Sequence, residues 1–134
     1  MNYSAQAIVI DNDRQIYLER NSKFNSLSFF GWKVEEGETY EQVLIREIEE
    51  ELWIRIRVER LLAGQEQGKR IFPTWEWVSK YFVLHLDNTE TNILGNTAVE
   101  VYSFQELERL HDNEFPFERV SFLQQIQRAL DTLY

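Results

Sequence analysis

Residues 39–52 have the spacing of a helix with one apolar face, and this helix limits the possible folds more than any other segment. Thr39 is followed three positions later by Gln42, a capping box that marks where the helix begins. Its apolar residues, three and four positions apart, are Leu44, Ile45, Ile48 and Leu52. An apolar helix face of this length must be covered by another element, so the chain is predicted to fold in layers.

The segments around this helix have strand patterns. Apolar or alternating runs cover residues 4–11, 15–20, 30–34, 54–66, 75–87 and 98–102. The first two runs are separated by a short turn and predict a hairpin, whereas residues 21–28 predict a polar loop.

Two further helices are expected near the end of the chain. Ser103 and Glu106 form a second capping box, which opens a short helix. Residues 118–133 predict a longer helix with an apolar stripe made of Val120, Leu123, Ile126, Leu130 and Leu133. Strands mixed with one-sided helices indicate an α/β sandwich, in which helices cover a sheet.

The composition narrows the range of partners. With 134 residues, the chain is expected to form a single domain, residues 1–134. Its formal net charge of -9 argues against binding DNA or RNA as a polymer, because that affinity comes largely from Lys and Arg. The sequence has no cysteine, which excludes disulfides and thiolate metal sites. Since it shows neither a signal peptide nor a run of about 18 apolar residues, we expect a cytoplasmic protein with no membrane partner.

Three carboxylates gather on one face of the helix predicted at residues 39–52. At about 100° per residue, Glu47, Glu50 and Glu51 point in similar directions. Like charges at this spacing destabilise an isolated helix by roughly a few tenths of a kcal/mol per pair, so a compensating group is expected. A divalent cation such as Mg²⁺ binds carboxylate oxygens and would compensate. From these residues alone, a solvent-exposed acidic face is an equally good explanation.

The stretch at residues 32–54, WKVEEGETYEQVLIREIEEELWI, resembles the signature of the Nudix hydrolases. That signature is a glycine, five residues, Glu, seven residues, and then Arg-Glu-apolar-any-Glu-Glu-any-Gly-apolar. The residues at the required spacings are Glu38, Arg46, Glu47, Ile48, Glu50, Glu51 and Ile54. The two signature glycines are replaced by Trp32 and Trp53, while the preceding Gly31 is kept. Residues 29–31, 103–107 and 115–116 are also similar to landmarks of the family.

The resemblance implies a Nudix-type α/β/α sandwich with a mixed β-sheet. It also implies that the chain hydrolyses a phosphoanhydride in a small nucleoside diphosphate derivative, with Mg²⁺ or Mn²⁺ as cofactor. A nucleoside triphosphate such as oxidised dGTP is the first expectation, and ADP-ribose or another nucleotide sugar the second. The alternative is a Nudix-like nucleotide-binding or sensor module without turnover. A monomer or a homodimer is expected.

The resemblance also implies roles for individual residues. Glu50 and Glu51 would be the main metal ligands, Glu47 a third ligand or the general base, and the Gly31 carbonyl a further ligand. Arg46 would hold a carboxylate in place, together with Glu38. Other candidates for the general base are Glu90 and Glu100. The candidates for substrate contacts are Arg20, Glu38 and the rings of Phe24, Phe30, Trp32, Phe72, Trp75 and Trp77, one or two of which would face a nucleotide base.

Overall fold

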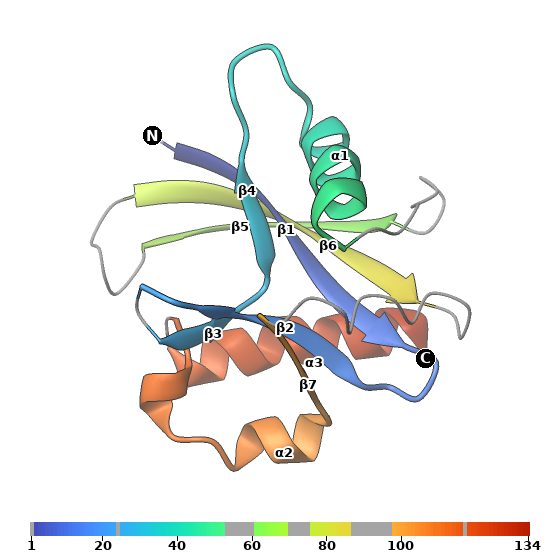
Figure 1. Cartoon of the computed structure of the whole chain (residues 1–134), viewed down its shortest axis with the longest axis vertical. Helices are drawn as coiled ribbons and strands as arrows, with labels where there is room; N and C mark the ends of the chain where they lie inside the picture. The colour runs from blue at the N-terminus through green and yellow to red at the C-terminus, as the bar shows by residue number, and fades with distance from the viewer. Residues whose placement is uncertain (1, 24, 53–60, 70–75, 87–97, 117) are drawn as a thin grey trace.

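The computed structural model describes residues 2–23, 25–52, 61–69, 76–86, 98–116 and 118–134 (Figure 1). Its strands are β1 (Asn2–Asp11), β2 (Ile16–Asn21), β3 (Ser26–Ser28), β4 (Phe30–Lys33), β5 (Leu61–Lys69), β6 (Glu76–Leu86) and β7 (Val99–Tyr102). Its helices are α1 (Tyr40–Leu52), α2 (Phe104–Glu108) and α3 (Arg119–Leu133), with a short 3-10 helix η3 (Asp112–Glu114).

The strands form one mixed sheet. Its main order is β3-β2-β1-β6-β5, with β4 also paired to β1 and β7 to β2. β1 and β6 run parallel over the whole of β1, from Asn2 opposite Trp77 to Asp11 opposite Leu86, and the other pairs are antiparallel. The long parallel pair places segments from opposite halves of the chain at the centre of the sheet.

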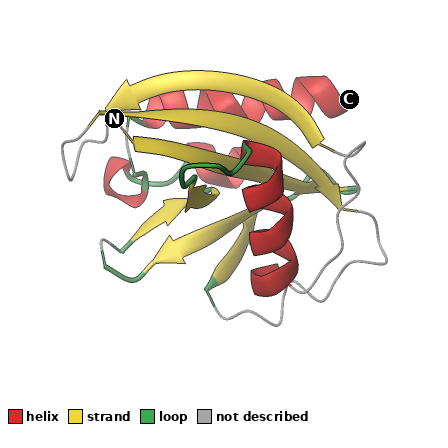
Figure 2. Cartoon of the chain, turned by 90° about the horizontal axis from the view of Figure 1, so that it is seen from above, coloured by secondary structure: helices red, strands yellow, loops and turns green. Residues whose placement is uncertain are grey.

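The two faces of β1 pack against different helices. Ala5, Ala7 and Val9 belong to a buried cluster with residues of α1, whereas Ile8 and Ile10 belong to a second cluster with residues of α3. This alternation follows from the two-residue period of a strand. Figure 2 shows α1 and α3 on opposite sides of the sheet. The predicted α/β sandwich with a mixed sheet is therefore confirmed.

Most predicted elements are present, with shifts at their ends. The hairpin of β1 and β2 forms, with Val9 opposite Tyr17. The polar loop predicted at residues 21–28 contains the short strand β3, which pairs with β2. The strand predicted at residues 54–66 is described as β5, Leu61–Lys69, and residues 54–60 lie outside the described residues.

The predicted apolar stripe of α3 is wrong at its first residue. Val120 is 66% exposed, while the buried residues of α3 are Phe122, Gln125, Ile126 and Ala129. Six positions separate Val120 from Ile126, which places the two side chains about 120° apart around the helix. Val120 therefore lies off the face that packs on the sheet. Within the described ranges, no helix has the length and apolar character needed to cross a membrane.

Candidate active site on helix α1

The start of α1 is held by the capping box that the sequence predicts. The Thr39 hydroxyl accepts a hydrogen bond from the Gln42 backbone N–H at 3.1 Å, and the Gln42 side-chain oxygen accepts one from the Thr39 N–H at 3.1 Å. These two bonds satisfy backbone donors that a helix start leaves without partners inside the helix. The first residue of α1 is thereby well defined.

The apolar side of α1 sets where its carboxylates lie. Val43, Leu44 and Ile48 are buried, and the helix packs on β1 and β4. The Glu47 side chain lies beside this buried face and is 23% exposed, whereas Glu50 is exposed. The Glu47 carboxylate therefore lies at the border of the packed face, and the Glu50 carboxylate lies on the exposed side of the helix.

The predicted trio of carboxylates is described only in part. Glu51 lies on α1, but its side chain lies outside the described residues. Among the side chains that the structure describes, no three His, Asp or Glu groups come together as a metal site. The assignment of Glu47, Glu50 and Glu51 as metal ligands stays a prediction.

Arg46 joins the loop before α1 to one of these carboxylates. Its Nη1 donates to Glu38 Oε2 at 2.8 Å, and its Nη2 donates to Glu47 Oε1 at 3.2 Å. Glu38 in turn accepts a hydrogen bond from the Glu35 backbone N–H at 3.2 Å. The turn between them contains Gly37 with a φ of 85°, a conformation that favours glycine. Arg46 thus contacts both carboxylates, and its role in orienting Glu47 at a metal site stays a prediction.

Gly31 lies on β4 opposite Gln6 of β1, and the Gln6 side chain occupies the space that a side chain at position 31 would need. A Cβ atom at position 31 would approach the Gln6 side-chain amide to between 2.3 and 2.6 Å. Gln6 is itself buried, and its Nε2 donates to the Ser4 hydroxyl. Glycine therefore fits this position without moving Gln6. The next residue, Trp32, lies opposite Ala5, and its half-buried ring packs against the cluster under α1.

The prediction that Phe30 contacts substrate is not supported by its position. The ring is 1% exposed and packs with Leu44 and Ile48 in the core beneath α1. Its side chain points to the same face of the sheet as Ala5 and Ala7, so it supports the helix instead. Of the other predicted contacts, Phe24, Phe72 and Trp75 lie outside the described residues, as does the side chain of Trp77. Trp53, at the second signature glycine, and the candidate base Glu90 also lie outside them.

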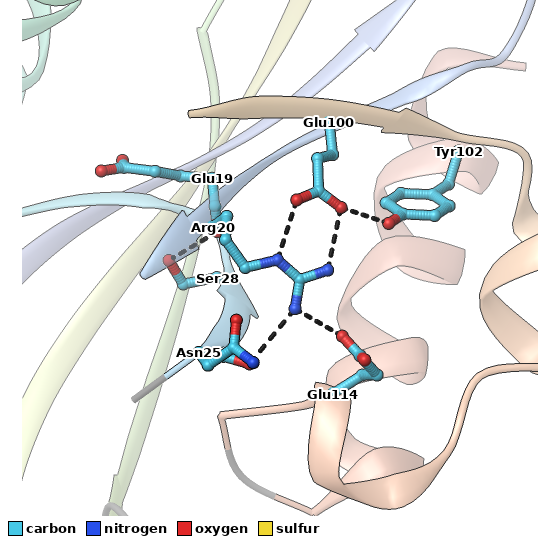
Figure 3. A network of polar contacts seen from close by, with 7 residues as sticks. All are labelled: Glu19, Arg20, Asn25, Ser28, Glu100, Tyr102 and Glu114. Atoms are coloured by element: carbon cyan, nitrogen blue, oxygen red, sulfur yellow. Dashed lines mark hydrogen bonds and ion pairs between the residues drawn. The ribbon is translucent and has the colours of Figure 1, made fainter. Parts of the chain in front are cut away.

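Arg20 lies in a network that joins three elements (Figure 3). Its Nε and Nη2 donate to the two carboxylate oxygens of Glu100 on β7, at 2.8 and 2.9 Å. Its Nη1 donates to Glu114 of η3 and to the backbone carbonyl of Asn25. Tyr102 donates its hydroxyl to Glu100. The Arg20 side chain is only 24% exposed, so this network closes the corner between β2, β7 and η3.

The network changes the acid–base properties of its members. The hydrogen bonds from Arg20 lower the pKa of Glu100 to about 2, although burial opposes the shift. Burial, followed by the bond to Glu100, raises the pKa of Tyr102 to about 12. A carboxylate with so low a pKa is a weak base, which disfavours Glu100 as the general base. That Arg20 contacts a phosphate of the substrate stays a prediction. Its pairing with the carboxylates of Glu100 and Glu114 argues against this role, because its charge is already neutralised.

The comparison with known families decides the family. The family described as NUDIX domain matches residues 1–125. The chain belongs to the NUDIX domain family. No curated protein matches the chain in sequence.

Solved structures share the NUDIX fold over nearly the whole chain. A NUDIX family hydrolase from Clostridium perfringens superimposes with a TM-score of 0.74 at 17% identity, covering 98% of this chain and 97% of that one. A structure of MutT, described for Aliivibrio salmonicida and Vibrio cholerae, superimposes with a TM-score of 0.61 at 21% identity, covering 93% of this chain and 94% of that one. NrtR from Shewanella oneidensis gives 0.73 at 13% identity, with 96% of this chain and 62% of NrtR covered.

The NUDIX family assignment confirms two predictions. The fold is the Nudix-type α/β/α sandwich, and the chain is a Nudix pyrophosphohydrolase, a hydrolase of nucleoside diphosphate derivatives. Nudix hydrolases generally use divalent metal ions.

Proposed function

We propose that this Nudix chain hydrolyses a phosphoanhydride bond with Mg²⁺ or Mn²⁺ held by α1. The observation that carries the proposal is the contact chain from Glu38 through Arg46 to Glu47. These residues stand at the signature spacing, and Arg46 restrains the Glu47 carboxylate as residues beside a metal site commonly do. Glu50 and Glu51 complete the proposed ligands, with the Gly31 carbonyl from β4.

The chemistry of these donors fits the proposed ion. Mg²⁺ and Mn²⁺ prefer carboxylate and carbonyl oxygens, and Glu50 offers an exposed carboxylate. A bound ion would neutralise charge on a pyrophosphate and lower the pKa of an attacking water. Glu47 lies beside the ligands and is proposed as the third ligand or as the general base. Arg46 would keep it oriented in either role.

The proposed substrate is a small nucleotide. A nucleoside triphosphate such as oxidised dGTP is the first choice, and ADP-ribose or another nucleotide sugar is the second. With a net charge of -9, the protein needs a bridging cation to bind such a polyanion. We further propose that residues 1–134 act as one domain, as a monomer or homodimer. We place the chain in the cytoplasm, because a chain without cysteine forms no disulfide and needs no oxidising compartment.

Binding of the ion is expected to stabilise the fold. At ten times its dissociation constant, Mn²⁺ should add about 1.4 kcal/mol to the free energy of unfolding, which raises the melting temperature by roughly 3–6 °C. Thermal unfolding with Mn²⁺, Mg²⁺ or Na⁺ measures this, and a nucleotide panel measures phosphate release under the same conditions. If millimolar Mn²⁺ and Mg²⁺ change neither melting nor phosphate release, the metal proposal is wrong.

A second candidate is a Nudix-like binding or sensor module without turnover. Two features support it. By the resemblance to the signature, Trp32 stands at a glycine position, and the fold is similar to that of NrtR, a protein also solved in complex with a 27mer DNA. Metal-dependent phosphate release separates the two candidates. A module would bind nucleotide, detected by calorimetry, without releasing phosphate or nucleoside monophosphate.

Trp32 is expected to influence which nucleotide is used. Trp32 is half-buried on β4, next to Gly31, and we propose that its exposed part contacts a bound base. Trp32→Gly should change the ratio of kcat/KM between a nucleoside triphosphate and ADP-ribose several-fold, whereas Trp32→Phe should keep most of the preference. Removing the packed part of the ring should also cost about 1–2 kcal/mol of unfolding free energy. A glycine variant that is only less stable, with an unchanged ratio, would show that the ring serves packing alone.

A further inference from the structure

A lysine of the central sheet reaches the start of α1. The Nζ atom of Lys80, on β6, lies 3.5 Å from the Glu41 Oε1. The same atom lies 5.6 Å from the centre of the Tyr40 ring and 5.5 Å from that of Phe82. The Lys80 side chain is only 29% exposed. It therefore contacts both residues that begin the helix.

Stability alone does not require a lysine at this position. Lys80 follows the side-chain alternation of Phe82 and Leu84, which are buried in the cluster beneath α1. An apolar side chain would cover that cluster without the cost of partly removing a charge from water. A half-exposed ion pair contributes little to stability in general. What distinguishes lysine here is the direction of its contacts, toward Tyr40 and Glu41.

These contacts approach α1 from the side opposite Glu50. Nine positions separate Glu41 from Glu50, so their side chains lie about 180° apart around the helix. In the sheet, Ala5 of β1 lies between Lys80 on one side and Trp32 of β4 on the other. Lys80 therefore holds the β6 side of α1, and Glu50 points away from it.

A second polar contact restrains the helix from another direction. Arg46 lies five positions after Glu41, about 140° around the helix, and bonds to Glu38 in the preceding loop. The buried residues Val43, Leu44 and Ile48 lie on the remaining arc of about 220° of the helix circumference, and the helix packs on β1 and β4. Apolar packing tolerates small rotations of a helix, whereas two charged contacts in different directions restrict them.

We propose that Lys80 is a positioning residue that sets the rotation of α1, and with it the direction of Glu47 and Glu50. The proposal rests on the proposed function, because the rotation of α1 affects activity only if Glu47 and Glu50 act in metal-dependent catalysis. Loss of the Lys80 contacts lets α1 turn on its apolar face and moves the carboxylates away from β4. Errors of about 1 Å at a reacting centre reduce turnover by up to about 100-fold.

The test compares Lys80→Met with Lys80→Arg, Glu41→Gln and the control Lys23→Met. Lys23 is an exposed lysine in the turn after β2, so its replacement makes the same change in net charge away from α1. Four quantities are measured: the melting temperature, kcat and KM, the dissociation constant of Mn²⁺ by electron paramagnetic resonance, and the hydrogen exchange of α1 amides.

In Lys80→Met, kcat should fall about tenfold with little change in KM, Mn²⁺ should bind several-fold more weakly, and α1 amides should exchange faster. The melting temperature should stay within a few degrees of the wild type. Lys80→Arg should restore most of kcat, Glu41→Gln should show a smaller loss, and Lys23→Met should match the wild type.

Two results would overturn the proposal. One is α1 exchange in Lys80→Met equal to that in Lys23→Met. The other is faster exchange with unchanged kcat and Mn²⁺ affinity, which makes Lys80 a packing residue only. If the wild type itself neither binds Mn²⁺ nor releases phosphate, the proposed function fails. The exchange data then still decide whether Lys80 docks α1, but its role toward the carboxylates is refuted with that function.

Discussion

Replacing Glu50 by glutamine is expected to reduce turnover by at least about 100-fold while leaving the fold intact. Glutamine keeps the shape of the side chain but removes the negative charge that an ion needs. Glu50 is exposed on α1, so the change removes no packing. Metal-dependent phosphate release, measured with circular dichroism and melting curves on the same samples, checks both parts of the prediction. Glu51→Gln is expected to have a similar effect.

Glu49→Gln is the matched control for this prediction. Glu49 is also exposed on α1, but it lies about 100° around the helix from Glu50 and 160° from Glu47. Its loss changes the net charge by the same amount, and activity should change less than about twofold. Similar losses from Glu49→Gln and Glu50→Gln would indicate a diffuse acidic surface and contradict a coordinated ion.

Replacing Arg20 by methionine is expected to lower the free energy of unfolding by about 2–3 kcal/mol at pH 7. The change leaves Glu100 and Glu114 near each other without the cation between them. This expected loss is smaller than that for a fully buried ion pair, because the Glu100 and Glu114 side chains are about one-third exposed and water screens their charges. Urea denaturation measures the loss, with Arg128→Met on the exposed side of α3 as the control.

The loss in Arg20→Met should depend on pH. In the wild type, the pKa of Glu100 is lowered from 4.5 to about 2, so this group stabilises the fold above pH 4.5 and loses that contribution as the pH falls toward 2. Without Arg20, the largest cause of that shift is absent, and protonation relieves the repulsion between the two carboxylates. The gap in stability between wild type and variant should therefore narrow between pH 5 and about pH 2.5. A gap that stays constant over this range would show that the ion pair does not cause it.

Local features of the fold follow directly from the sequence. Both capping boxes, Thr39 with Gln42 and Ser103 with Glu106, form as their spacing predicts. Their partners lie within one turn of helix, so the local backbone conformation is enough to bring them together. The β1–β2 hairpin is predictable for the same reason, because the turn between the strands is short.

The signature on α1 is also a local pattern, which explains why the candidate site could be located before the fold was known. Arg46 and Glu47 are neighbours on one helix, and Glu38 lies only eight positions before Arg46. The sequence does not reveal that Phe30 is buried. An aromatic residue beside a predicted site can serve either the core or the substrate, and its side of the strand depends on which helix covers that face.

Contacts between distant segments were decided by the tertiary structure alone. Arg20 and Glu100 are 80 positions apart, and Lys80 and Glu41 are 39 apart. The first pair meets because β7 pairs with β2, and the second because β6 runs parallel to β1 beneath α1. The sequence by itself determined most of the elements, both caps and the spacing of the carboxylates along α1, since those depend on residues within a turn or two of one another. Which charges become partners depended on strand order and register, because only the packed sheet brings those segments within the few ångströms over which ion pairs act.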